Sequence, residues 1–282
     1  MIAGVKASPP ASNTPFVVAI VLAGGGADDA LAARLGASSK ALVPLKGRPM
    51  GGYVLDAVAG AERVAQTVWV GETTAGMDGA VDVQVGGGST LAESLAIGLG
   101  AAEALAGPDA RLLVVTADVP WLRPSSVDRF VVEALGHATA DLVYPVVDRA
   151  VSEAVFPGHR RTWVRLRHGE VTGGNLVLAT PTGLRAALPW MTYAYRHRKQ
   201  PWRLAWRVGL PTLAALLLGR ARDVDLARRA SRLIGVPTAV LRSDDPSLAM
   251  DVDRPDDLPL TLDLDSDPPV GGLPSGHASR HG

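Results

Sequence analysis

The 282-residue sequence contains no cysteine. This absence excludes disulfides, thiolate metal sites and cysteine nucleophiles, and it fits a reducing compartment. Charge of one sign is not in excess either, because 28 Lys and Arg balance 28 Asp and Glu. A balanced total gives no general attraction to nucleic acid or to a membrane surface. We therefore expect a cytoplasmic protein that has no nucleic-acid partner.

Long hydrophobic runs are also missing. The longest candidate, residues 208–218, contains glycine and proline and is too short to span a bilayer. Residues 1–14 lack the apolar core of a signal peptide and are predicted to be a flexible arm. Residues 265–282 are rich in proline, glycine and small polar residues and are predicted to be a disordered tail. One domain over residues 15–264 is expected, because a chain of this length is near the upper limit for one core.

What the sequence does contain is a series of short β-branched apolar runs. Strands are predicted at residues 16–22, 67–70, 112–116, 141–145 and 175–178. Helices are predicted between several of them, at residues 51–59, 90–106 and 124–135. Thr90 and Glu93 have capping-box spacing, and Pro124 falls in a first helical turn. The alternation predicts an α/β protein in which crossover helices cover a layered sheet.

The first predicted strand ends in three glycines, Gly24, Gly25 and Gly26. Glycines between a buried strand and a helix allow backbone amides to approach a phosphate chain. Downstream, Lys40 offers a mobile positive charge to the phosphates, and Arg34 is a second candidate for that role. The pattern is neither a Walker loop nor a G-x-G-x-x-G dinucleotide loop. An ordinary tight turn is the structural alternative.

A carboxylate, Asp118, follows the predicted strand at residues 112–116 in the stretch VTADVPWL. Ligands of open α/β sheets bind beyond the carboxyl ends of the strands. Magnesium takes one or two protein oxygens and completes its octahedron with water and phosphate. Asp118 is therefore the first candidate ligand for Mg²⁺, and the alternative is an Asx turn.

Together, LAGGG at residues 22–26, a following lysine and ALVPLKGRPM at residues 41–50 resemble the MobA-like nucleotidyltransferases. That family includes molybdenum-cofactor guanylyltransferases and is related to sugar-phosphate nucleotidyltransferases. The resemblance implies a Rossmann-like three-layer α/β/α sandwich of the glycosyltransferase-A type, with a mostly parallel mixed sheet. It also implies that the glycine loop wraps the triphosphate, that Lys40 contacts phosphate and that Asp118 binds magnesium. Residues 27–32 stretch the spacing of the family between the glycines and Arg34.

The residues expected to contact the nucleotide are Leu22, Ala23, Gly24, Gly25, Gly26, Lys40, Gly87 and Ser94.

Three further elements match the family pattern: the stretch with Gly87 and Ser94, the pair Gly174 and Asn175, and the pair Asp251 and Asp253. Gly87 and Ser94 belong to a glycine-rich stretch that also fits a simple loop entering a helix. Gly174 and Asn175 resemble an acceptor-side element, with a turn as the alternative. Either Asp251 or Asp253 is expected to be the second ligand for the metal, and the sequence does not choose between them.

The expected reaction moves a nucleoside monophosphate from a nucleoside triphosphate, GTP or CTP, to a phosphorylated or hydroxyl acceptor, and it releases pyrophosphate. Lys40, Arg34 and Asp118 are the expected catalytic residues, and Mg²⁺ is the expected cofactor. A metal-dependent glycosyltransferase of the same fold is one alternative, although it has no need of the glycine loop with Lys40. A non-catalytic nucleotide-binding relative is another, and Asp118 argues against it.

A basic, tryptophan-rich helical insertion is predicted at about residues 190–234. It contains seven basic residues and no acidic residue between positions 196 and 222. Three interpretations stay open: helices packed on the sheet, a lid for an anionic small-molecule acceptor, or a peripheral contact with membrane lipids. The histidines, His159 among them, are predicted to lie mostly at the surface. Asp256 and Asp257 are predicted to cap a final helical turn. The oligomeric state is not predicted.

Overall fold

The computed structural model describes residues 16–24, 30–74, 77, 80–107 and 109–258. Both predicted ends, 1–14 and 265–282, lie outside these residues. The strands of the main sheet are β1 (Val17–Leu22), β4 (Val64–Val70), β5 (Val83–Val85), β6 (Leu112–Thr116), β7 (Leu142–Asp148), β8 (Val164–Leu166), β9 (Gly169–Gly173), β10 (Leu176–Ala179) and β11 (Thr238–Ser243). A separate ribbon pairs β2 (Pro44–Leu45) with β3 (Arg48–Pro49).

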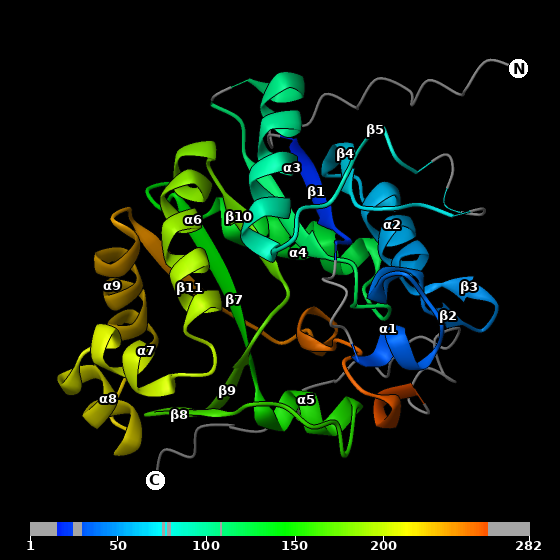
Figure 1. Cartoon of the computed structure of the whole chain (residues 1–282). Helices are drawn as coiled ribbons and strands as arrows, with labels where there is room; N and C mark the ends of the chain where they lie inside the picture. Colours follow the sequence, from blue (N-terminus) through cyan, green and yellow to red (C-terminus); the bar gives the residue numbers. More distant parts are fainter. Residues whose placement is uncertain (1–15, 25–29, 75–76, 78–79, 108, 259–282) are drawn as a thin grey trace, which may run out of the picture.

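Among the described residues, nine strands form one mixed sheet in the order β5-β4-β1-β6-β10-β7-β9-β8, with β11 also paired to β7 (Figure 1). Strands β5, β4, β1 and β6 run parallel to one another. Strand β10 runs antiparallel between β6 and β7, and β11 is parallel to β7. The mostly parallel mixed sheet predicted from the family resemblance is confirmed.

Helices cover both faces of this sheet. They are α1 (Ala30–Arg34), α2 (Met50–Gly60), α3 (Leu91–Ala106), α4 (Pro124–Leu135), α5 (Arg149–Val155), α6 (Pro181–Arg196), α7 (Pro201–Val208), α8 (Leu210–Leu217) and α9 (Asp223–Ile234), with 3₁₀ turns η1 (Lys40–Leu42) and η2 (Pro246–Ala249). Alternate residues of β1 point to opposite faces. Val17, Ala19 and Val21 pack in the core beneath α2 and α4, whereas the intervening side chains pack beneath α3 and α6. The α/β/α sandwich is thus confirmed.

The predicted helix starts match local hydrogen bonds. The Thr90 side chain accepts a hydrogen bond from the Glu93 N–H at 3.2 Å and so caps α3. The Glu93 carboxylate accepts from the Ser89 N–H at 2.8 Å, one residue before the cap. Pro124 is at the start of α4, where its missing N–H costs no helical bond. Within α3, a Cβ at Gly98 would lie 2.6 Å from Ile20 Cγ2, so this glycine allows the helix to approach the sheet.

The insertion differs from its prediction at its start. Helix α6 begins at Pro181, nine residues before the predicted position, because Thr180 caps it by accepting a hydrogen bond from the Gly183 N–H at 2.9 Å. Helix α9 forms the last part of the predicted insertion. Among the described residues, no helix is long and apolar enough to cross a membrane.

Candidate active site

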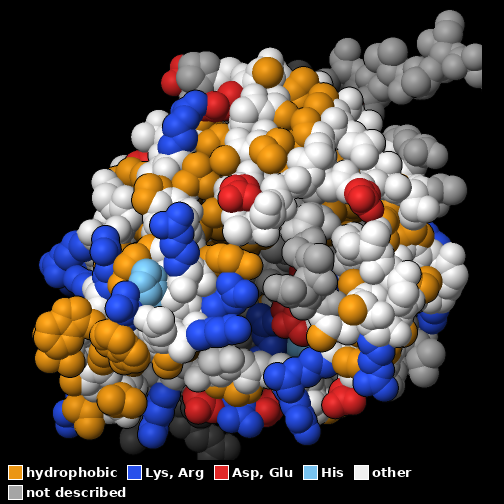
Figure 2. Space-filling view, viewed as in Figure 1, with side chains coloured by type: hydrophobic (Ala, Val, Ile, Leu, Met, Phe, Trp, Pro, Cys, Tyr) orange, Lys and Arg blue, Asp and Glu red, His pale blue; other side chains and the backbone are white. Residues whose placement is uncertain are grey.

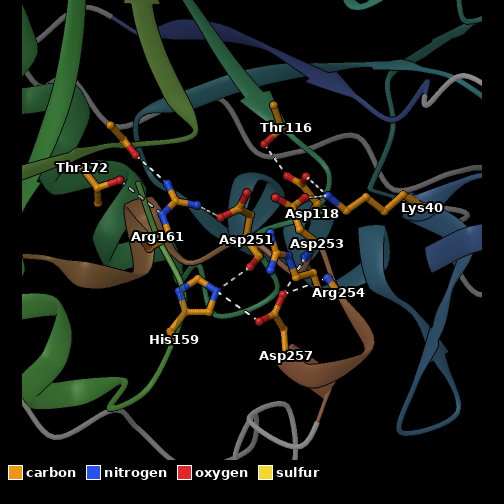
Figure 3. Close-up of polar contacts among 11 residues, drawn as sticks. Lys40, Thr116, Asp118, His159, Arg161, Thr172, Asp251, Asp253, Arg254 and Asp257 are labelled. Atoms are coloured by element: carbon orange, nitrogen blue, oxygen red, sulfur yellow. Dashed lines mark hydrogen bonds and ion pairs between the residues drawn. The ribbon is translucent and has the colours of Figure 1, made fainter. Parts of the chain in front are cut away.

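Lys40 and Asp118 meet at the carboxyl end of the central strands (Figure 3). Asp118 follows β6 directly, and Lys40 opens η1. Lys40 Nζ lies 2.7 Å from Asp118 Oδ2 and also donates a hydrogen bond to Asp253. The Thr116 hydroxyl donates to Asp118 Oδ1 at 2.6 Å, which fixes the orientation of that carboxylate. One ammonium group thus bridges two of the predicted metal ligands.

A third carboxylate, Asp251, joins this cluster. Ligand atoms of Asp118, Asp251 and Asp253 all lie within 4.8 Å of one another. The Val252 N–H donates to the Asp118 carbonyl oxygen at 2.9 Å, which ties the two distant segments together. The Asp257 carboxylate accepts from the backbone N–H of Asp253 at 3.0 Å. The predicted capping role of Asp257 is therefore confirmed, and the cap fixes the backbone at Asp253.

The charge of Lys40 is set by its surroundings. Burial lowers the pKa of the Lys40 ammonium, but the charges of Asp118 and Asp253 and their hydrogen bonds outweigh burial, so that the pKa is raised above its ordinary value. Lys40 is therefore protonated at neutral pH and offsets the repulsion between the two carboxylates.

Arg161, which the sequence analysis did not select, is part of the site. Its guanidinium donates to the Gly173 carbonyl oxygen at 2.8 Å and to the Thr172 hydroxyl at 3.3 Å, and it forms an ion pair with Asp251. Burial lowers the pKa of Arg161, and the charge of Asp253 partly offsets this effect. Arg161 thus connects the acceptor-side motif to the acidic cluster.

The prediction that His159 lies at the surface is wrong. Its side chain is 3% exposed, because the segment that carries it packs against residues 251–257. His159 Nε2 lies 3.1 Å from the Asp251 carbonyl oxygen and 3.7 Å from Asp257 Oδ1. Burial lowers the pKa of His159, although Asp257 acts in the opposite direction, so the ring is neutral at pH 7. A neutral ring whose Nε2–H donates to this carbonyl supports the backbone of Asp251.

Three of the predicted nucleotide contacts, Gly24, Gly87 and Ser94, lie next to one another. A Cβ at Gly24 would lie 2.8 Å from Ser94 Oγ and 3.4 Å from the Gly87 Cα, so these three residues adjoin. The Ser94 hydroxyl accepts a hydrogen bond from the Gly88 N–H at 3.0 Å. Leu22 and Ala23 lead into this region from β1. Gly25 and Gly26 lie outside the described residues.

Gly174 and Asn175 occupy a break between β9 and β10. Here the Gly174 N–H donates to the Pro145 carbonyl oxygen at 2.9 Å, and the Asn175 N–H donates to the Leu248 carbonyl oxygen at 2.7 Å. A Cβ at Gly174 would lie 2.9 Å from Pro145 Cγ, which explains the glycine. Asn175 Nδ2 is buried and has no hydrogen-bond partner among the described residues. Such an unsatisfied buried donor is uncommon in folded proteins.

A cavity of about 770 Å³ opens beside the acidic cluster, in the hollowed part of the surface where acidic and basic side chains meet (Figure 2). It is lined by Arg149, Glu153, Gly158, His159, Arg160, Arg161, Thr162, Trp163, Thr172, Asp251, Asp253, Arg254 and Asp257. Four arginines, four carboxylates and one tryptophan thus line the cavity.

Arg34 is exposed at the end of α1. The polar contacts of the described residues do not link it to Lys40 or to the acidic cluster. Its catalytic role stays a prediction.

The fold and the site define a nucleotide-binding α/β/α enzyme with an acidic cluster at the carboxyl ends of its strands. Residues 19–199 match the family model of the MobA-like NTP transferase domain. The chain belongs to this family and is a nucleotidyltransferase, as the sequence predicted.

Comparison with solved structures supports the assignment. A hypothetical transferase from Thermus thermophilus is 40% identical, with a TM-score of 0.76, over 86% of this chain and 99% of the other. Two more distant structures share the fold. A 4-diphosphocytidyl-2C-methyl-D-erythritol synthase has 19% identity and a TM-score of 0.54, over 89% of this chain and 99% of its own. A CMP:2-keto-3-deoxy-manno-octonic acid synthetase complexed with CTP has 14% identity and a TM-score of 0.52, over 88% and 98%. A search of curated proteins found no match to this chain.

Proposed function

We propose that this protein transfers a nucleoside monophosphate from GTP or CTP to an anionic small-molecule acceptor and releases pyrophosphate. The observation that carries the proposal is the Lys40 ammonium between Asp118 and Asp253. Two predicted nucleotide contacts, Gly24 and Ser94, adjoin one another at the end of β1. CTP is a candidate donor because one structure of the same fold is a complex with CTP, and GTP because the family includes guanylyltransferases.

The donor set fits magnesium, because three carboxylates lie within 4.8 Å of one another at the carboxyl end of β6. We assign Asp118 and Asp253 as its ligands. Asp251 is engaged by the partly buried Arg161, whereas Lys40 is the partner of Asp253 and its long side chain moves easily toward phosphate. Bound Mg²⁺ would neutralise phosphate charge and orient the α-phosphate.

The residues of the chain then act by position and charge. Lys40 exchanges its carboxylate partners for the triphosphate, where its charge stabilises the departing pyrophosphate. An acceptor oxygen forms the new bond to the α-phosphorus while the bond from that phosphorus to the pyrophosphate oxygen breaks. The acceptor proton leaves to solvent, or is already absent from a phosphate acceptor. No protein nucleophile is required.

The acceptor occupies the cavity beside Asp251 and Asp253. Arg149 is paired with Glu153 and Glu170, and Arg161 with Asp251. Arg160 also lines the cavity, and no carboxylate among the described residues forms an ion pair with it, so it favours a phosphate or carboxylate. Trp163 offers an apolar surface. We also assign Asn175 Nδ2, at the break between β9 and β10, as a donor on the acceptor side. These features support an anionic acceptor of small size.

A pyrophosphate-release assay tests this function. It combines each of the four triphosphates with Mg²⁺ and a panel of phosphorylated and hydroxyl acceptors. We expect Asp118→Asn and Lys40→Met to lower kcat/KM by about a hundredfold or more, the usual effect of losing a charge that stabilises the transition state. Asp253→Asn should lower it strongly, and Asp251→Asn less.

Asp256→Asn is the matched control, because Asp256 is an exposed carboxylate in the same segment. It should retain wild-type activity. Release of nucleotide from a nucleotide-sugar donor, with no pyrophosphate from any triphosphate, would contradict the proposal in favour of a glycosyltransferase.

A further inference from the structure

Helices α7 and α8 present apolar side chains to solvent. Neither helix contains a buried residue. The large side chains that are at least 60% exposed here are Trp202, Trp206, Leu210, Leu217 and Leu218. Figure 2 shows hydrophobic side chains gathered at the lower left, where Figure 1 places α7 and α8. Water-facing tryptophan and leucine at this density mark a surface with a partner.

Basic side chains accompany this patch. The exposed cations of the α6–α7 segment are Arg196, Arg198, Lys199, Arg203 and Arg207. Within the part of the chain that the structure describes, no carboxylate forms an ion pair with any of these five. Arg203 lies over the Trp202 ring at 5.0 Å, so cation and aromatic ring share one surface. These five cations together with the five apolar side chains above are named the Trp–Arg surface.

We propose that the Trp–Arg surface docks on an anionic membrane. Tryptophan is favoured at the boundary between headgroups and acyl chains, and leucine is favoured below it. Arginine and lysine bind lipid phosphates and extend their stems along the apolar layer. A nucleic acid would satisfy the cations alone and leave Leu217 and Leu218 in water. A bilayer surface accepts both groups at once.

The surface is held on the domain rather than suspended from it. On its inner side, Ala215 and Leu216 of α8 pack against a small core that contains Leu166 of β8 and Val171 of β9. Arg229 of α9 donates a hydrogen bond to the Arg207 carbonyl oxygen at the end of α7. Because these contacts fix the inner side of the helices, the exposed side chains are available to lipid without unfolding.

Co-sedimentation of the full chain with vesicles tests the proposal, using phosphatidylcholine alone or an equal mixture with phosphatidylglycerol, at 50 mM and 500 mM salt. We expect binding to the anionic vesicles at low salt and its loss at high salt. Arg198→Gln/Arg203→Gln/Arg207→Gln should weaken binding by about a hundredfold, from roughly fivefold for each charge near an anionic surface. Trp202→Ala/Trp206→Ala should also release the protein.

Two control variants are matched to these changes. Val132→Ala shortens an exposed apolar side chain on α4, and Arg185→Gln removes a cation that Glu103 pairs. Both should bind as the wild type does. Absence of wild-type binding at 50 mM salt, or equal loss in test and control variants, overturns the proposal, whatever other anion the surface binds. The proposal is independent of the proposed function, because Trp202→Ala/Trp206→Ala should retain pyrophosphate release with a soluble acceptor.

Discussion

Replacing Lys40 by methionine isolates the electrostatic role of its ammonium. Methionine keeps a long flexible side chain but removes the charge between Asp118 and Asp253. The two carboxylates then face each other without the cation that now offsets their repulsion. We expect Lys40→Met to lower the free energy of unfolding in the absence of divalent metal, and we expect magnesium to restore it.

The magnitude follows from the geometry. Two unit charges at the 4.8 Å limit of the cluster repel by about 3.5 kcal/mol at an effective dielectric constant of about 20. The Asp253 side chain is 60% exposed, so solvent reduces this to about 1–2 kcal/mol. In domains of roughly 150–250 residues, a loss of about 1 kcal/mol in the free energy of unfolding lowers Tm by about 2–4 °C, and we apply the same relation here. The expected decrease is therefore about 2–8 °C.

Thermal unfolding with EDTA and with 10 mM MgCl₂ measures the effect. Magnesium should raise the Tm of Lys40→Met more than that of the wild type, because the metal binds the folded state that has lost its internal cation. Adding Asp118→Asn should restore most of the Tm without metal. Lys199→Met, a change at an exposed lysine between α6 and α7, should leave Tm within about 1 °C. A Lys40→Met variant with a wild-type Tm in EDTA, or an equal response of both proteins to magnesium, would refute the reasoning.

Two other perturbations test the fold and the buried histidine. Gly98→Ala places a methyl group 2.6 Å from Ile20 Cγ2 and should cost about 1–3 kcal/mol in urea unfolding. Gly100→Ala, in the same helix with open space around it, should stabilise by about 0.5–1 kcal/mol; equal effects would contradict the packing argument. Because burial lowers the pKa of His159 below 6.5, the unfolded chain takes up this proton first. Stability should therefore fall as pH drops from 6.5 through the folded-state pKa, and His159→Gln should reduce that slope in EDTA; an unchanged slope would show that His159 is not its source.

The parts of the fold that could be predicted are those in which local sequence and global packing agree. Strand β1 is buried on both faces, and its continuous apolar run signals that position. Helix α3 begins where Thr90 caps it. Asp118 was predictable because a carboxylate at the end of a buried parallel strand lies where ligands bind.

Elements at one edge of the sheet were not predicted, for a physical reason. Strands β8 and β9 are short and carry charged, exposed residues, so they show no apolar run. Strand β11 is only partly buried, and among the described residues it pairs only with β7. Arg161 and His159 acquire their burial from packing against residues 251–257, far away in the chain. A contact between segments so far apart in the chain leaves no periodic pattern in the local sequence, so the burial of these two side chains could not be predicted.

Although its net charge is zero, this protein has two regions of opposite local charge, the acidic cluster and the Trp–Arg surface. In the site, Asp118, Asp251 and Asp253 converge because two distant segments meet, and they need Lys40, Arg161 or a metal for balance. On the Trp–Arg surface, five cations lack carboxylate partners among the described residues. The electrostatic screening length is about 8 Å at physiological ionic strength. Opposite charges farther away in the protein therefore do not cancel the local charge of either region. The acidic site attracts cations, and the Trp–Arg surface attracts anions. The net charge predicts neither property, because it adds up the charges without regard to where they lie in the fold.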